Sequence, residues 1–168
     1  MFLKMLNEEL DIKIFILYVL SKLPGPCEFE SLYDIAYESG VSYFDYAQCL
    51  NDLIDNGNII RDEDGIYITD MGRKNTEAVF RELPFSVRNK ADRYIIPLSE
   101  KIQRMALITS DYEAADGGYV MHLGMNDGAG DIIKMELFVA DEKQAKIIKK
   151  KFKRSAEKIY KDIVGLLS

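Results

Sequence analysis

Apolar residues recur along the chain with two different periods, and the period changes near residue 106. Before that point they recur every three or four residues, which is typical of amphipathic helices, apart from a short interruption at residues 59–68. Residues 106–113, 119–126 and 131–139 alternate with a period of two, which is typical of strands, and a helical period returns after Asp141. The pattern therefore predicts an α+β fold.

Residues 28–69 are predicted to form two short helices and a hairpin. The first helix ends at Gly40, because glycine readily adopts the left-handed turn that follows many helices. The second begins after Ser42, which stands three residues before Asp45 in a capping-box-like arrangement, and it ends at Gly57. Two short β-runs then flank an Asp-Glu-Asp-Gly turn. In the second helix we expect Phe44, Ala47, Leu50, Leu53 and Ile54 to point inward, and Tyr43, Tyr46, Gln48 and Cys49 to face solvent.

This stretch resembles the winged helix-turn-helix of bacterial regulators. The resemblance lies in the run Leu50-x-x-Leu53-x-x-x-Gly57-x-Ile59 followed by Tyr67-x-Thr69-x-x-Gly72, as in MarR-like and PadR-like groups. It implies a winged helix-turn-helix domain at residues 1–83, with the second helix in the position that reads DNA. The whole chain also resembles a family of small uncharacterised bacterial regulator-like proteins, and this looser resemblance implies no known activity.

The N-terminal helix is predicted to run from a cap at Asn7 to Lys22, and its middle is apolar on every side. Such a helix is buried all round, whereas a small winged helix covers only one side of it. The second cover is either the C-terminal domain or a second subunit, and a homodimer interface is the favoured alternative. The residues expected at a homodimer interface are Phe15, Ile16, Tyr18 and Val19.

The second half is predicted to contain a linking helix and a βββα domain. A helix capped by Thr69 or the next residue runs to Leu83, and another, capped by Ser86, is kinked or split at Pro97. The three strands are expected to form an antiparallel sheet with one covered face. The predicted divisions are residues 1–83 for the winged helix, 84–105 for the linking helix and 106–168 for the βββα domain.

The last helix is predicted to start at a capping box formed by Asp141 and Gln144 and to cover the sheet with one apolar stripe. Its other face is rich in lysine. Two roles are open for the βββα domain: it senses a small molecule, or it packs and dimerises. The covering stripe is expected to comprise Ile148, Phe152, Ala156, Ile159, Ile163 and Leu167.

Composition and cysteine usage indicate an ordinary globular protein. The 168 residues are 48% hydrophobic and 30% charged, enough for one domain with an appendage or for two small ones. Cys27 and Cys49 have neither C-x-x-C spacing nor neighbouring histidines, which argues against a disulfide framework or a zinc site. No signal peptide or membrane-spanning run is visible. We therefore expect a cytoplasmic protein with no cofactor and no metal.

No catalytic centre is predicted. The single histidine, His122, falls inside a predicted strand and has no nucleophile motif to serve, so a structural or surface role is expected. The glycines at 124, 128 and 130 occupy a turn between two strands instead of preceding a helix, which excludes a dinucleotide loop. We expect no enzymatic activity.

Charge separates two possible functions. Residues 1–70 hold 4 Lys and Arg against 14 Asp and Glu, a net charge of −10, within a chain of net charge −6. In the first hypothesis the protein is a dimeric transcriptional regulator whose DNA affinity depends on cations that neutralise phosphates. In the second it does not bind DNA, and its acidic, tyrosine-rich face docks on a basic partner protein. The DNA-contacting residues of the first hypothesis are Ser42, Tyr43, Tyr46, Gln48, Arg61, Arg73 and Lys74, and the second relies on Tyr43 and Tyr46.

Overall fold

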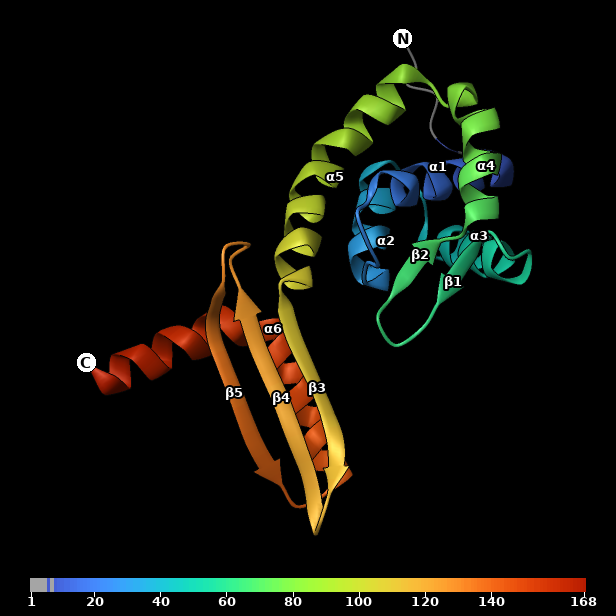
Figure 1. Ribbon diagram of the computed structural model, residues 1–168. Helices are drawn as coiled ribbons and strands as arrows, with labels where there is room; N and C mark the ends of the chain where they lie inside the picture. Colours follow the sequence, from blue (N-terminus) through green and yellow to red (C-terminus); the bar gives the residue numbers. More distant parts are fainter. Residues whose placement is uncertain (1–5, 7) are drawn as a thin grey trace. The chain divides into compact units, whose positions relative to one another are not determined.

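The computed structural model describes residue 6 and residues 8–168, and it divides into two compact units (Figure 1). Unit 1 comprises Met1–Ile102 and is mainly helical, and unit 2 comprises Gln103–Ser168 and contains an antiparallel sheet. The predicted α+β class is therefore confirmed. Each unit has its own hydrophobic core.

Unit 1 contains the helices and the hairpin that the helical period and its interruption predicted. Three helices are followed by a two-stranded hairpin and two further helices. The elements are α1 (Glu9–Lys22), α2 (Phe29–Glu38), α3 (Tyr43–Asp55), β1 (Ile59–Arg61), β2 (Ile66–Ile68), α4 (Asp70–Val79), the 3₁₀ turn η1 (Phe80–Glu82) and α5 (Phe85–Ala106), whose last residues enter unit 2.

The ends of these elements follow local chemistry. The backbone N–H of Asp45 donates to Ser42 Oγ at the start of α3, and that of Gly72 donates to Thr69 Oγ1 at the start of α4. Gly40 after α2 has φ of 87° and Gly57 after α3 has φ of 70°, a region that favours glycine. The predicted caps at Ser42 and Thr69 and the two glycine stops are thus confirmed.

The middle of helix α1, from Ile14 to Leu20, is buried on all sides within its own chain, which corrects the predicted dimer interface. It packs against α2, α3, α4, η1 and β2, and the Tyr18 hydroxyl donates to Asp92 Oδ1 of α5 at 2.8 Å. The rest of unit 1, chiefly α4 and η1, thus supplies the second cover, and α5 adds this hydrogen bond. A surface that is already covered cannot bind a second subunit without unfolding. The four residues assigned to that interface, Phe15, Ile16, Tyr18 and Val19, are 0 to 4% exposed.

The face of α3 that is buried also differs from the prediction. Tyr46 and Cys49 are buried, whereas Phe44 is 74% exposed. The buried positions are Tyr46, Cys49, Leu50 and Leu53, which follow the i, i+3, i+4, i+7 spacing of one helix face. Phe44 lies on the opposite face, together with Gln48 and Asn51.

Two predicted helix boundaries are wrong, one lies outside the described residues, and the split expected at Pro97 does not occur. The helix after the hairpin ends at Val79 instead of Leu83, because the chain tightens into η1 before Pro84. Helix α5 starts at Phe85, directly after Pro84, so Ser86 lies inside the helix and does not cap it. The helix continues through Pro97 without being split. Asn7, the predicted cap of α1, is not among the described residues.

Unit 2 is the predicted three-stranded antiparallel sheet with one long helix on one face. The strands β3 (Ile108–Ala115), β4 (Gly118–Asn126) and β5 (Asp131–Val139) are in the order β3-β4-β5. Helix α6 (Glu142–Leu167) starts at Asp141, whose carboxylate accepts the Gln144 backbone N–H at 2.8 Å. The core between them is formed by Met121, Leu123, Met125, Val139, Ala145, Phe152 and Ala156.

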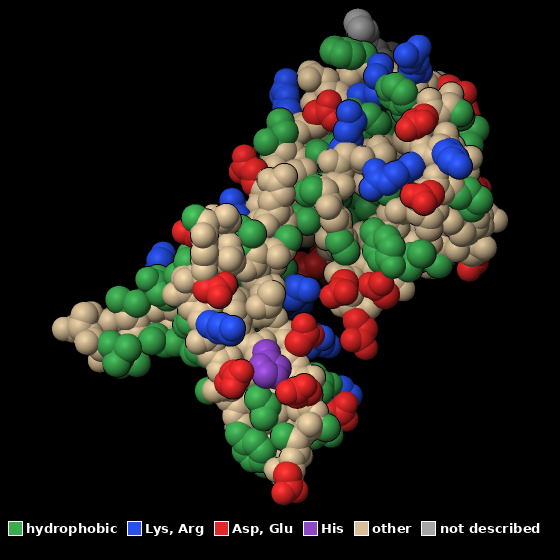
Figure 2. Space-filling model, viewed as in Figure 1, with side chains coloured by type: hydrophobic (Ala, Val, Ile, Leu, Met, Phe, Trp, Pro, Cys, Tyr) green, Lys and Arg blue, Asp and Glu red, His purple; other side chains and the backbone are tan. Residues whose placement is uncertain are grey.

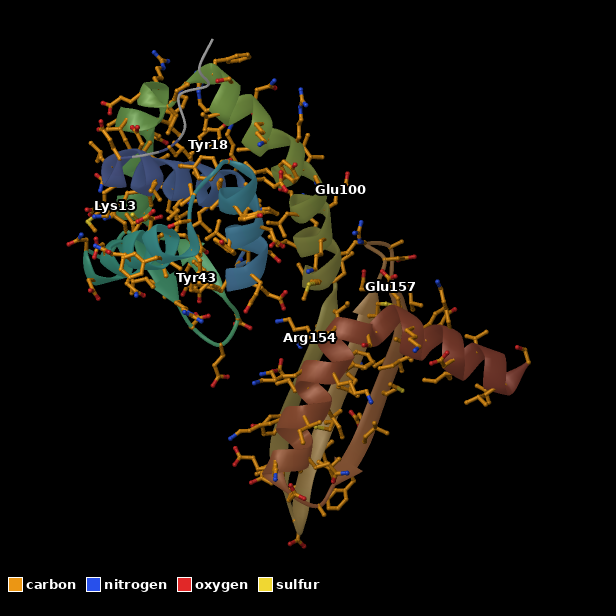
Figure 3. All side chains as sticks on the ribbon, turned by 180° about the vertical axis from the view of Figure 1, so that it is seen from behind. Lys13, Tyr18, Tyr43, Glu100, Arg154 and Glu157 are labelled. Atoms are coloured by element: carbon orange, nitrogen blue, oxygen red, sulfur yellow. The ribbon has the colours of Figure 1, made fainter. Side chains whose placement is uncertain are left out.

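The covering stripe of α6 ends earlier than predicted. The backbone of Ser155 leaves the helical region, with φ of −131° and ψ of 16°, so α6 bends there. In Figures 1 and 3 the part of α6 that follows this bend extends past the β5 edge of the sheet. Leu167, which was expected to cover the sheet, is 84% exposed.

Candidate functional site

Helices α2 and α3 carry a cluster of five aromatic rings that runs from the core of unit 1 to its surface. Tyr46 is the buried base: its ring lies 5.0 Å from that of Phe29 and 5.1 Å from that of Tyr33, and its hydroxyl donates to the Phe29 carbonyl oxygen. Burial raises the pKa of the Tyr46 phenol far above its usual value, so the hydroxyl remains protonated. Tyr43 and Tyr37 extend the cluster outward from Tyr33.

The exposed end of this cluster lies on α2 and the start of α3, and α3 also exposes Phe44, Gln48 and Asn51. Tyr37 is 64% exposed and Tyr43 58% exposed, and Figure 3 labels Tyr43 where α2 and α3 meet. Large exposed aromatic side chains are the usual anchors of binding interfaces. We define the α2–α3 face as Tyr37, Tyr43, Phe44, Gln48 and Asn51.

Acidic side chains outnumber basic ones near this face, where the cation at the end of α2 is Lys90, whose ammonium donates to the Glu38 carbonyl oxygen. Glu38 ends α2, Asp45 lies in the first turn of α3, and both are exposed. The turn of the hairpin, Asp62-Glu63-Asp64, adds three more carboxylates. Asp62 orders this turn, because its carboxylate accepts the Asp64 backbone N–H at 2.9 Å and the Tyr67 hydroxyl at 3.0 Å. Anions would be repelled from such a surface.

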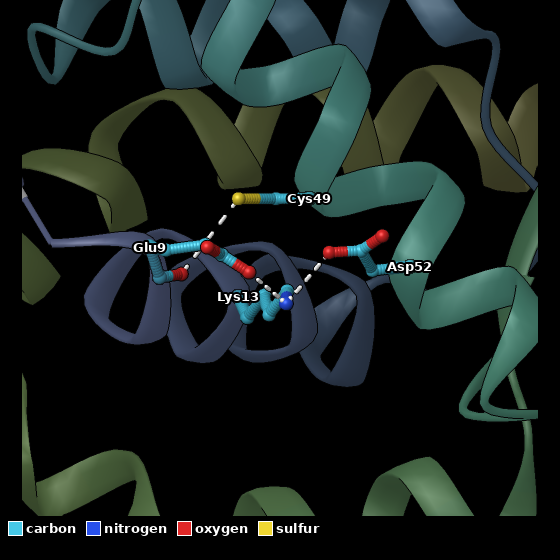
Figure 4. Close-up of polar contacts among 4 residues, drawn as sticks. All are labelled: Glu9, Lys13, Cys49 and Asp52. Atoms are coloured by element: carbon cyan, nitrogen blue, oxygen red, sulfur yellow. Dashed lines mark hydrogen bonds and ion pairs between the residues drawn. The ribbon is translucent and has the colours of Figure 1, made fainter.

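Two cations that contact α2 or α3 are already engaged. The Lys13 ammonium of α1 lies between the carboxylates of Glu9 and Asp52, and the Asp52 contact is 2.8 Å (Figure 4). These two hydrogen bonds, with Asp52 first, raise the Lys13 pKa well above its usual value. The Arg61 guanidinium stacks over the Phe29 ring at 5.3 Å. Both side chains therefore join parts of unit 1 to one another.

Arg73 and Lys74 lie on α4, after the hairpin in the chain. Within the described part of the chain, none of their hydrogen bonds or ion pairs is with the exposed residues of α3. The Arg73 guanidinium donates to the Ser21 carbonyl oxygen at the end of α1, at 3.2 Å. Arg73 also lines a hollow together with Asp62, Asp64 and Tyr67 of the hairpin. Lys74 is exposed on the same helix. The structure thus gathers Ser42, Tyr43 and Gln48 at one surface, buries Tyr46 and ties Arg73 to α1.

The remaining candidates for a nucleophile or a base are two cysteines and one histidine. The cysteine thiols are protonated, and the histidine is flanked by carboxylates. Burial raises the pKa of Cys27 to about 12 and that of Cys49 to about 11, so both thiols are protonated at neutral pH. His122 lies on the uncovered face of the sheet, 3.2 Å from Glu113 and 3.4 Å from Glu136, and Figure 2 shows acidic side chains beside it. Across the described part of the chain, no group of three potential metal ligands converges.

The sequence pattern of one protein family, described as "Domain of unknown function (DUF4364)", matches residues 12–167. The chain belongs to this family. The DUF4364 match covers both units, from within α1 to the end of α6. No curated protein and no solved structure matches the chain. Among the described residues of this DUF4364 chain, none of the helices has the length and apolar character of a membrane span.

Sequence reasoning missed three residues of the α2–α3 face in the DUF4364 chain. Phe44 was expected in the core because it is apolar, and Asn51 was not considered. A signal for both exists in the sequence: once Tyr46, Cys49, Leu50 and Leu53 are taken as the buried face, Phe44 and Asn51 fall opposite to it. Tyr37 was likewise left unassigned, although it follows Tyr33 by one helical turn.

Proposed function

We propose that the protein binds a basic segment of a partner protein through the α2–α3 face. The observation that carries this proposal is the exposure of three large aromatic side chains, Tyr37, Tyr43 and Phe44, within an acidic surrounding. Aromatic residues are enriched in the cores of protein interfaces, where they bury a large area with few rotatable bonds. The acidic rim would attract a lysine-rich or arginine-rich partner and orient its approach.

The scaffold that presents this face is, in this proposal, a winged helix. Three features support it: helix α2, a turn through Gly40 and helix α3; the hairpin β1-β2; and a third extended segment at Cys27, which exchanges backbone hydrogen bonds with Ile66. Winged helices serve more than one function, so the site and not the fold has to decide between them. The site contains no lysine or arginine on α3.

We expect short synthetic peptides rich in lysine and arginine to bind the full-length chain, and length-matched glutamate-rich peptides not to bind. Fluorescence anisotropy at low salt measures both affinities. Replacing Tyr43 and Phe44 together by alanine should weaken binding of the basic peptide by about tenfold or more, because truncating a central aromatic anchor typically costs about 2 kcal/mol.

The matched control is Phe85→Ala. Phe85 is 74% exposed, the same fraction as Phe44, but it lies at the start of α5 and outside the α2–α3 face. This variant should bind the basic peptide like the unmodified chain. Equal binding of basic and acidic peptides, or equal losses with Phe85→Ala and the double variant, would show that the face is not the docking surface.

A second candidate function is DNA binding by a dimeric regulator, and one observation favours it. Gln48 and Asn51 are exposed on successive turns of α3, and side-chain amides of this kind form bidentate hydrogen bonds with adenine in the major groove. Phosphate neutralisation would have to come from Arg61 and from cations beyond α3, such as Arg73 and Lys74, because α3 itself has none.

For this second candidate we expect the protein to select a defined sequence from sheared genomic DNA at about 50 mM salt and to lose it at about 200 mM. Replacing Gln48 and Arg61 together by alanine should abolish the selection, since it removes one base-reading amide and the cation of the hairpin. Recovery of the same sequence by this double variant would exclude α3 and the hairpin as the reading surface, and no enrichment at either salt would reject DNA binding by the purified chain.

A further inference from the structure

Strand β5 is an edge of the sheet in unit 2 and exposes apolar side chains. It pairs with β4 on one side, and within the described residues no strand pairs with its other side. Phe138 is 60% exposed, Leu137 43% and Ile132 38%. An open edge that also exposes apolar residues is a template for another strand. Natural proteins usually protect such an edge or use it for assembly.

The residues of β5 are arranged symmetrically about Met135. Lys134 precedes it and Glu136 follows it, and beyond this charged pair lie two apolar residues on each side. In an antiparallel pair, residues directly opposite one another share one face of the sheet. Two copies of β5 paired about Met135 would therefore place Lys134 of each copy opposite Glu136 of the other, which gives two equivalent contacts. Ile133 would face Leu137 and Ile132 would face Phe138 in the same way.

Other registers of the same pairing are unfavourable. When a twofold axis perpendicular to the sheet relates two antiparallel strands, one residue lies opposite its own copy, and this residue is the centre of the pair. Centring it on Lys134 would place two lysines opposite each other, and centring it on Glu136 would place two glutamates opposite each other. Centring it on Ile133 or Leu137 would place a charged residue opposite an apolar one. Met135 is the centre that pairs opposite charges with each other and apolar residues with each other.

The other edge of the sheet, β3, is unsuited to the same pairing. Asp111 and Glu113 stand on either side of Tyr112, so an antiparallel pair centred on Tyr112 would bring like charges together. Helix α6 also contacts this strand, since Lys149 lies 2.9 Å from Asp111 and its carbonyl accepts the Ser110 hydroxyl. The two edges of one sheet thus differ: α6 packs more extensively on β3 than on β5, and the charges of β3 oppose pairing about Tyr112.

The end of α6 provides an independent observation on the same side of the sheet. After the bend at Ser155 the helix extends past the β5 edge in Figures 1 and 3. Leu166 is 86% exposed, Leu167 84% and Val164 44%. Strands of a second copy added at β5 would continue the sheet in the direction in which this apolar end extends, so they would give it a surface to pack on.

We infer that two copies of this chain associate through antiparallel pairing of β5 about Met135, forming a six-stranded sheet. The occupant of the open edge is a second copy because the order of charged and apolar residues in β5 is self-complementary, as a twofold interface requires. The inference is independent of the proposed function, since it concerns unit 2 and the proposed docking surface lies on unit 1.

The test measures the mass of the full-length chain by light scattering after size exclusion, from low to high micromolar concentration. The unmodified chain should have twice the 19.2 kDa mass of one copy. Lys134→Glu replaces two attractive cross-strand contacts by repulsive ones and should raise the dimer dissociation constant by about tenfold or more. Adding Glu136→Lys to this variant reverses the charge order in both copies and should restore the dimer.

Glu113→Lys, a charge reversal on the β3 edge, is the matched control and should leave the dimer intact. Met135→Cys supplies a second readout, because the two thiols would lie opposite each other and oxidation should link the copies covalently, whereas Tyr112→Cys should not. A monomer at all concentrations, a dimer indifferent to Lys134→Glu, failure of the charge-swapped variant to restore it, or no cross-link at Met135 would each overturn the inference.

Discussion

Replacing Phe152 by alanine is expected to destabilise unit 2 by about 3–5 kcal/mol, the usual cost of truncating a buried phenylalanine. Phe152 is 2% exposed and lies in the centre of the α6 stripe that covers the sheet. A unit of this size, Gln103–Ser168, has a small core, and its total stability is of the same order as the loss. Unit 2 should therefore be largely unfolded at room temperature while unit 1 remains folded.

Amide hydrogen exchange followed by mass spectrometry distinguishes the two units. Protection should disappear from the three strands and α6 and persist in α1 to α4. The control is Ile147→Ala on the same helix, because Ile147 is 57% exposed and its truncation should cost no more than about 0.5 kcal/mol. Loss of protection in both units would show that they fold as one cooperative unit, and unchanged protection would show that Phe152 is not a core residue.

Local signals predicted most elements of the fold because they depend on few residues. The cap at Ser42, the glycine stops after α2 and α3, and the alternation of β5 require only neighbouring positions, and the structure confirms them. The bend at Ser155 was not predicted, because no proline or glycine lies near it in the sequence. The extent of the covered part of α6 depends on the length of the sheet, which a helical period alone does not specify.

Decisions about what covers an apolar surface were harder, since they depend on distant parts of the chain. The sequence showed that α1 is apolar all round, but its second cover comes from α4 and η1, and α5 adds the Tyr18–Asp92 hydrogen bond across a separation of 74 residues. For the open β5 edge, the sequence pattern is clear and only its position in the sheet has to come from the structure. The self-complementary order of charged and apolar residues in β5 can be read from the sequence. It predicts pairing between two copies only once the structure shows that β5 is an edge strand.

The α2–α3 face was predicted in character but not in detail. Its acidic, tyrosine-rich nature follows from composition, and Tyr43 is exposed as expected. The error at Tyr46 and Phe44 arose because tyrosine was treated as polar and phenylalanine as apolar. A tyrosine can be buried when its hydroxyl finds an acceptor, as Tyr46 does at the Phe29 carbonyl.

Replacing Tyr46 by alanine is expected to cost about 3–5 kcal/mol of the stability of unit 1, whereas Phe44→Ala should change it by less than about 0.5 kcal/mol. Tyr46 is fully buried and contacts Phe29 and Tyr33, while Phe44 is largely exposed. Tyr46→Phe keeps the ring and loses only the hydrogen bond to Phe29, so it should cost about 1 kcal/mol. Denaturant unfolding followed by circular dichroism measures all three.

The two substitutions together separate the structural role of the aromatic cluster from its proposed binding role. Phe44→Ala should weaken the binding of basic peptides without changing stability, because its side chain contacts solvent in the free protein. Tyr46→Ala should change stability first and affect binding through the position of Tyr43, which packs on the same rings. If Phe44→Ala proved the more destabilising of the two, the register of α3 described here would be wrong, and with it the membership of the α2–α3 face.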